Sequence, residues 1–309
     1  MRNVPVDEVD ALDRAVLAIG TDYPPGHLLP YHEHRRAQVL YAATGVMELA
    51  TAEGRWTVPP DRAVLIPAGT RHQVSMPGVS TRSLYIEPAA VPWFPARCRV
   101  VEVSALLREL LLAAVDMQPL YPEHGRDAAL VGLLLHELAD LAPLPLDIPL
   151  PADPEIRRLC DVFLRHPDIH DPPARWAAAL GISERTLGRR FNAATGLTFA
   201  QWRQRACIVH SLRHLAAGVP VTRLAVDLGY DSPAAFTTAF RTLLGRPPSA
   251  YRATGQTGNP TSGTRTEPFA ADPAYGRIHN TLNNTGSTAD TDLTVKATTA
   301  YGDITARSL

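Results

Sequence analysis

The sequence predicts an α+β chain, with an antiparallel β-domain first, a helical segment next and an all-helical domain after it. Short β-rich runs separated by Gly, Pro and Asp fill residues 14–88, a pattern typical of a barrel or sandwich. Over residues 104–141 leucines recur at helical spacing on wide apolar faces. Residues 154–253 are Arg-rich and carry a helical pattern that occurs twice.

These patterns divide the chain into five parts. We expect a β-domain over residues 1–98, a helical segment over 99–142, a Pro-rich linker over 143–153, an all-helical domain over 154–253 and a tail over 254–309. Because proline lacks the backbone donor, the linker cannot be a regular helix and is predicted to be a stiff connector. The tail has few large apolar residues to bury, so it is predicted to be disordered.

The formal net charge of −1 hides two regions of opposite charge. Residues 1–152 carry 12 basic and 18 acidic side chains, whereas residues 153–252 carry 14 arginines, no lysine and 8 acids. Such an asymmetry indicates a polyanion-binding module attached to an acidic carrier.

Three features predict a cytoplasmic protein without a membrane partner. The first residues show no apolar run after a basic start, as a signal peptide would. No stretch approaches the ~18 uncharged apolar residues of a membrane span. Cys98, Cys160 and Cys207 are odd in number and far apart, which favours buried, reduced thiols over a disulfide framework.

Residues 175–191, RWAAALGISERTLGRRF, predict two short helices joined by a glycine turn. Gly181 marks the turn, and Ser183 is placed to cap the second helix, since its hydroxyl can accept a bond from the free amides of the first turn. Leu187 and Phe191 would hold this helix inward. The same order of features recurs in residues 221–240, with Gly229 and Ser232. A tandem pair of helix-turn-helix units is far more specific than one.

From about residue 173 onward, the chain resembles the AraC/XylS family of bacterial transcription regulators. The family's signature is present almost in full as LAVDLGYDSPAAFTTAFRTLLGRPPSAYR, residues 224–252, and the resemblance covers about residues 173–252. It implies a seven-helix domain that binds double-stranded DNA, with two recognition helices in successive major-groove segments ~34 Å apart.

The resemblance places the DNA contacts residue by residue. In the first unit the candidates are Ser183, Arg185, Gly188, Arg189 and Arg190, and in the second they are Ser232, Pro233, Ala234, Ala235 and Thr238. Arg185 and Arg189 can each offer a bidentate fork to guanine. Arg241, Arg246 and Arg252 are expected to bind phosphates. For any single arginine, a solvated helix face is the alternative.

The N-terminal domain contains two closely spaced histidines in residues 31–41, YHEHRRAQVLY. On an extended strand side chains alternate, so His32 and His34 share one face and Glu33 takes the other. Gly26, His32, His34, Gln38 and Gly45 have the spacing of the first cupin motif, with Gln38 where Glu is usual. The segment Pro-Ala-Gly-Thr-Arg-His that ends at His72 resembles the second motif, although Asp61 and Met76 depart from the family pattern.

The cupin resemblance covers about residues 14–87 and implies a small β-barrel that collects His32, His34, Gln38 and His72 at its mouth. Three imidazoles and one oxygen suit a divalent transition metal, although the neutral Gln38 amide weakens the binding of a hard dication. The alternative is an effector pocket whose histidines only form hydrogen bonds. Tyr31, Tyr41 and Met76 are further pocket candidates, as is Trp56, with core packing as the alternative for each.

Three functions fit these observations. The first is a DNA-binding transcription regulator whose cupin domain senses a small molecule or a metal; it would contact RNA polymerase if it activates. The second is a metal-dependent cupin enzyme, a dioxygenase or isomerase fused to a DNA-binding domain; we find no acid–base partner for it and expect no catalytic residues. The third is an architectural nucleoid protein, which has no need of a sensor domain. We expect the regulator.

The leucine-rich helices predict a homodimer. Their wide apolar faces could pair two chains, or they could pack on the chain's own barrel. The leucines concerned are Leu106, Leu110, Leu111, Leu130, Leu133, Leu134 and Leu138.

Overall fold

The computed structural model describes residues 1–251, 294–299 and 302–307. The chain divides into two compact units, residues 1–255 and 256–309. Most of the tail predicted to be disordered lies outside the described residues. The part that is described is a β-hairpin of β12 (Thr294–Thr299) and β13 (Gly302–Arg307).

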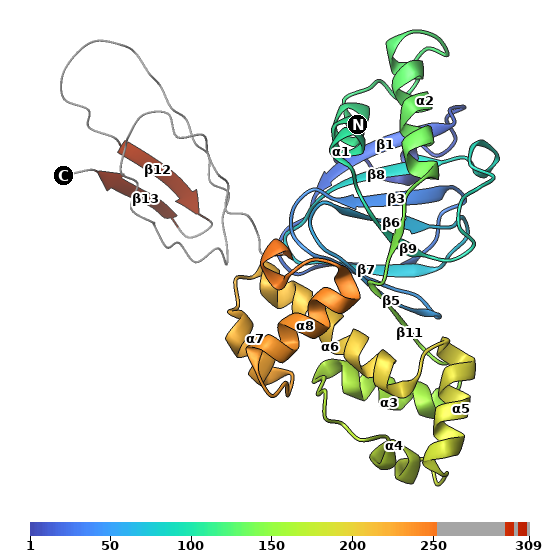
Figure 1. Cartoon of the computed structure of the whole chain (residues 1–309). Helices are drawn as coiled ribbons and strands as arrows, with labels where there is room; N and C mark the ends of the chain where they lie inside the picture. The colour runs from blue at the N-terminus through green and yellow to red at the C-terminus, as the bar shows by residue number, and fades with distance from the viewer. Residues whose placement is uncertain (252–293, 300–301, 308–309) are drawn as a thin grey trace. The chain divides into compact units, whose positions relative to one another are not determined.

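The N-terminal domain is a cupin-like sandwich of two antiparallel sheets (Figure 1). The first sheet has the order β1 (Val16–Asp22), β8 (Ser80–Ile86), β3 (Ala37–Ala42), β6 (Arg62–Ile66), β9 (Arg99–Glu102) and β10 (Pro143–Leu144). The second has the order β11 (Asp147–Pro149), β5 (Gly54–Val58), β4 (Met47–Ala50), β7 (His72–Met76) and β2 (His27–His32). Positive-φ glycines such as Gly45 and Gly78 occupy the tight turns that let consecutive strands reverse.

Two helices cover the outer face of the first sheet (Figure 1). They are α1 (Ala105–Val115), which is capped by the Ser104 hydroxyl, and α2 (Arg126–Ala139). The predicted leucine faces divide between two environments. Leu111, Leu130, Leu134 and Leu138 are buried against the chain's own sheet, Leu110 is half-buried, and Leu106 and Leu133 are 49% and 44% exposed.

The segment predicted as a Pro-rich linker pairs with both sheets. Pro143 and Leu144 extend the first sheet beside β9, and residues 147–149 extend the second beside β5. Proline is compatible with both places because an edge strand leaves one row of backbone donors unpaired. Pro143 and Pro149 therefore lie on edge strands, and the segment is paired with the sheets instead of being a free linker.

The C-terminal domain consists, between residues 153 and 251, of six α-helices and a closing 3-10 turn. The helices are α3 (Pro154–Arg165), α4 (Pro173–Ala179), α5 (Glu184–Thr195), α6 (Phe199–Ala216), α7 (Val221–Asp227) and α8 (Pro233–Leu244), and the turn is η3 (Pro248–Tyr251). The resemblance implied seven helices, and η3 takes the last place because Pro247 and Pro248 interrupt the chain there.

The helical domain packs on the second sheet, and one hydrophobic core contains buried residues of both. Trp202 of α6 donates its indole N–H to the Pro149 carbonyl of β11 at 2.8 Å. Arg205 of α6 pairs at 2.9 Å with Asp147, which also belongs to β11. The two domains are therefore joined by a packed interface as well as by the chain.

Candidate functional sites: a histidine cavity and two helix-turn-helix units

His32, His34 and His72 come together between the two sheets. His32 ends β2 and pairs in register with His72 at the start of β7. The ring centroids of His32 and His72 are 4.3 Å apart, and that of His34 lies 4.9 Å from His32. Each ring offers one nitrogen to a group of three nitrogens that all lie within 4.8 Å of one another. Glu33 is exposed, but it and His34 lie in the loop after β2 and not on the strand that the sequence predicted.

Backbone carbonyls fix the tautomers of two of these rings. His32 Nδ1 donates to the Pro30 carbonyl at 2.7 Å, and His72 Nδ1 donates to the Thr70 carbonyl at 2.8 Å. Because a carbonyl only accepts, Nδ1 carries the hydrogen in both, and Nε2 keeps its lone pair. The Nε2 atoms of His34 and His72 are buried and have no hydrogen-bond partner among the residues that the structure describes. His72 therefore combines both features that metal-binding histidines show, a free Nε2 and an Nδ1 held by an acceptor.

The electrostatics of the cavity keep His34 and His72 neutral. Burial, together with the smaller effects of the neighbouring His32 and His72, lowers the pKa of His34 to about 4. Burial also lowers the pKa of His72 to about 4, against the opposing effect of its bond to Thr70. At neutral pH both therefore present lone pairs that can bind an electron-pair acceptor.

Gln38 of β3 faces the same cavity from the other sheet. Its amide nitrogen donates to the Tyr85 hydroxyl at 3.2 Å and to the Ser83 hydroxyl at 3.5 Å, both on β8. Its Oε1 is buried and accepts no hydrogen bond from the described part of the chain. The cavity thus contains several unpaired acceptors, and a metal ion or a ligand rich in donors would satisfy them.

The cavity has a volume of about 330 Å³, which is large enough for a small molecule. Met76 lines it as predicted, whereas Tyr31 and Tyr41 do not. Tyr31 is 48% exposed and packs under Arg71. Tyr41 is fully buried on the opposite face of β3, where its hydroxyl donates to Asp61 at 3.0 Å, because it lies at an odd spacing from Gln38.

Sequence reasoning missed much of the lining. Ser83 and Tyr85 share one face of β8, a period-two pattern that was present in the sequence. One wall of the cavity is formed by the N-terminal segment Val4, Pro5, Val6 and Asp7. No local sequence pattern predicts this position.

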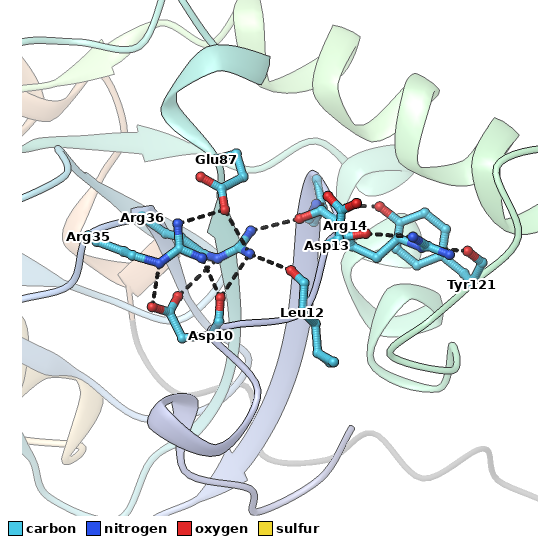
Figure 2. Close-up of polar contacts among 9 residues, drawn as sticks. Asp10, Leu12, Asp13, Arg14, Arg35, Arg36, Glu87 and Tyr121 are labelled. Carbon is cyan, nitrogen blue, oxygen red and sulfur yellow. Dashed lines mark hydrogen bonds and ion pairs between the residues drawn. The ribbon is translucent and has the colours of Figure 1, made fainter.

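Just after this wall, the chain is held by the two arginines that follow the histidine pair (Figure 2). Arg36 is completely buried, donates to the carbonyls of Leu12 and Arg14, and pairs with Asp10 at 3.0 Å and Glu87 at 2.8 Å. Arg35 pairs with the same two carboxylates at 2.6 and 2.8 Å. A buried guanidinium requires such partners, so the cluster fixes the chain that follows the wall.

Both helix-turn-helix units form as predicted from their turns and caps. Gly181 and Gly229 have φ of +62° and +76°, which glycine adopts without strain. Ser183 Oγ accepts from the Thr186 amide at 3.2 Å, and Ser232 Oγ accepts from the Ala235 amide at 3.1 Å. The inward Leu187, Phe191, Phe236 and Phe240 are all fully buried.

The structure divides the predicted DNA contacts by exposure. Most project into solvent from α5 and α8: Ser183, Arg185, Arg189, Arg190, Pro233, Ala234, Ala235, Thr238 and Arg241 are exposed, while Gly188 and Ser232 are half-buried. Arg190 pairs with Asp153, the N-cap of α3. Arg246 pairs with Glu102 of β9 at 2.8 Å. Arg252 lies outside the described residues.

Cysteine and membrane predictions concern the rest of the chain. Cys98, Cys160 and Cys207 are free and buried. In the part of the chain that the structure describes, no helix is long and apolar enough to cross a bilayer.

Together, a ligand-binding cupin-like domain and tandem helix-turn-helix units define a DNA-binding transcription regulator. Residues 15–139 match the AraC-like ligand binding domain and residues 176–254 match a helix-turn-helix domain. The chain is 33% identical over 234 residues to the HTH-type transcriptional regulator NimR of Escherichia coli K12, covering 75% of this chain and 85% of NimR. The chain belongs to the AraC family of transcription regulators.

Other similarities cover less or are more distant. The HTH-type transcriptional regulator RipA of Corynebacterium glutamicum is 35% identical over 126 residues, which are 40% of this chain and 36% of RipA. The crystal structure of ToxT from Vibrio cholerae aligns with 77% of this chain and 98% of its own, at 10% identity and a TM-score of 0.33. The relatives are named as regulators and not as enzymes.

Proposed function

We propose that the cupin-like domain senses a divalent transition metal, bound by His32, His34 and His72 with Gln38 as an oxygen donor, and that its occupancy controls DNA binding. The buried, unpartnered Nε2 atoms of His34 and His72 carry this proposal. A bound metal ion would accept these lone pairs and so satisfy the buried nitrogens. A donor-rich small molecule in the same cavity is the alternative effector.

For DNA recognition, the first unit provides sequence discrimination through Arg185 and Arg189. Both are exposed on α5 and form no ion pair within the described residues. The second unit offers Pro233, Ala234 and Thr238, which suit thymine methyl groups and phosphates. Arg241 serves phosphates. Arg190 and Arg246, which already pair with carboxylates, contribute less than a solvated arginine would.

The regulator acts as a homodimer on repeated half-sites. Leu106 and Leu133 support this, because they leave apolar surface on α1 and α2 after the other leucines have packed on the sheet. As an activator it would contact RNA polymerase, and as a repressor it would exclude it. Its place of action is the cytoplasm.

Elemental mass spectrometry of the purified full-length protein tests the sensor. We expect about one equivalent of a transition metal, and its loss in the His32→Ala/His72→Ala variant. The matched control is His124→Ala/His136→Ala, which removes two exposed histidines outside the cluster and leaves the metal content unchanged. Absence of metal after reloading in the wild-type protein would contradict the metal proposal and leave the small-molecule effector.

A further inference from the structure

Strand β7 has the histidine cavity on one face and the DNA-binding domain on the other. His72, Val74 and Met76 line the cavity, as alternate residues of one strand do. Gln73 and Ser75 face the opposite way and line a separate hollow of about 220 Å³. The far wall of this hollow includes His210 and Arg213 of α6, together with Leu164 of α3. One strand therefore separates the candidate effector site from the helical domain.

The helix across this hollow holds the two DNA-binding units together. Three residues separate α6 from α5, the recognition helix of the first unit, and four residues separate α6 from α7 of the second unit. Its Arg213 lies 3.6 Å from Glu48 of β4. Glu48 in turn pairs in register with Ser75 of β7, so the two lie side by side in the sheet. A displacement of α6 would alter how the two units are presented to successive segments of the major groove.

We propose that β7, with Glu48 beside it, transmits occupancy of the histidine cavity to α6 through the Glu48–Arg213 contact. The inference rests on the proposed sensing function and specifies its route. A ligand can shift an equilibrium only if it contacts two arrangements differently, and His72 is the group on β7 that would do so. Close-packed sheets transmit small displacements rather than absorbing them. The hollow beside Gln73 and Ser75 leaves α6 room for a second position.

Occupancy of the cavity could also be transmitted in the other direction, through β3, which carries Gln38, to the helices α1 and α2 packed on the first sheet. The two routes give different results in hydrogen–deuterium exchange, because exchange reports opening of each segment separately. Full-length protein is measured metal-free and with Zn²⁺ as the probe. We expect exchange to change by about fivefold or more, a typical size for coupling, in β7 and in α6, with little change in α1 and α2.

Charge reversal isolates the proposed contact. Glu48→Arg places two cations together, so the Zn²⁺ response should remain in β7 and disappear from α6. Adding Arg213→Glu to this variant should restore the response. The matched control is Arg55→Glu, which reverses another ion pair across the same interface, that of Arg55 with Asp161 at 2.9 Å, and should leave the response in α6 intact.

Two results would overturn the route while leaving sensing in place. One is a response of β7 that is accompanied by α1 and α2 instead of α6. The other is a response of α6 that survives Glu48→Arg unchanged. If Zn²⁺ altered exchange in neither β7 nor β2, the metal site itself would be refuted, and the route argued from it would fall as well.

Discussion

At the scale of single residues, the carbonyls of Pro30 and Thr70 decide what the histidine cluster is able to bind. By accepting from Nδ1 they direct the Nε2 lone pairs of His32 and His72 away from the backbone. Ser83 and Tyr85 do the same for Gln38, because they accept from its amide nitrogen and leave Oε1 unpaired in the cavity. The groups that accept these hydrogen bonds thus orient His32, His72 and Gln38 within the cavity.

Gln38 provides a direct test of this arrangement. Gln38→Glu keeps the size of the side chain and adds a negative charge, so we expect the metal to bind more tightly by about tenfold or more. Gln38→Leu removes the oxygen and should weaken binding. Competition with a chromogenic chelator measures both. Equal affinity in all three proteins would exclude Gln38 as a ligand.

Arg185 and Arg189 are the residues that we expect to determine base recognition at the same scale. A bidentate arginine–guanine pair contributes ~1–3 kcal/mol of discrimination. Arg185→Ala and Arg189→Ala should each reduce affinity for a duplex selected from a random pool by about tenfold or more, and affinity for an unrelated duplex far less. Arg158→Ala, an exposed arginine on α3, is the control. Wild-type affinity of the double variant in fluorescence anisotropy would remove α5 as the recognition helix.

At the scale of elements, each helix-turn-helix turn contains a glycine at positive φ, but the two glycines have different surroundings. A Cβ on Gly181 would meet nothing within 4 Å, whereas a Cβ on Gly229 would lie 2.3 Å from Asp168 Oδ1. That oxygen also accepts from the His170 amide at 2.9 Å. The second turn is therefore built into the loop between α3 and α4, and the first is open to solvent.

Alanine substitutions should separate the two turns. Gly181→Ala places a Cβ at positive φ and should cost ~1–2 kcal/mol of unfolding free energy. Gly229→Ala pays the same strain and also displaces Asp168 from His170, which adds on the order of 1 kcal/mol. Urea denaturation of the full-length variants measures the difference. Equal losses in the two would show that Asp168 yields without cost.

The elements also show how far sequence reasoning extends. Local rules are sufficient for the turns and caps, because Gly229 and Ser232 act on their own neighbours. Strand geometry explains less at His32 and His34, because β2 ends at His32 and His34 lies in the loop that follows. Partners distant in the chain follow from no such rule. Pairing of Pro143 with β9, the ion pair of Arg246 with Glu102, and the wall that Val4–Asp7 adds to the cavity all depend on tertiary packing.

At the scale of the whole molecule, α1 and α2 bury one face on the chain's own sheet and leave Leu106 and Leu133 exposed, the surface through which we propose that two copies pair. Leu106 and Leu133 are about half exposed, so covering the remainder would contribute roughly 0.7–1.5 kcal/mol each. Leu106→Glu/Leu133→Glu should therefore convert a dimer to a monomer in sedimentation at micromolar concentration. Leu28→Glu, an equally exposed leucine on β2, should leave the mass unchanged. A wild-type monomer with and without DNA would refute dimerisation.

The central claim joins the two ends of the molecule: occupancy of the histidine cavity changes DNA binding. The most direct measurement is the affinity of the full-length protein for its selected duplex, metal-free and fully loaded, at one fixed salt concentration. The account predicts affinities that differ by about fivefold or more in the wild-type protein, in the range typical of allosteric coupling, and that coincide in His32→Ala/His72→Ala. Equal affinities in a fully loaded and a metal-free wild-type protein would contradict it.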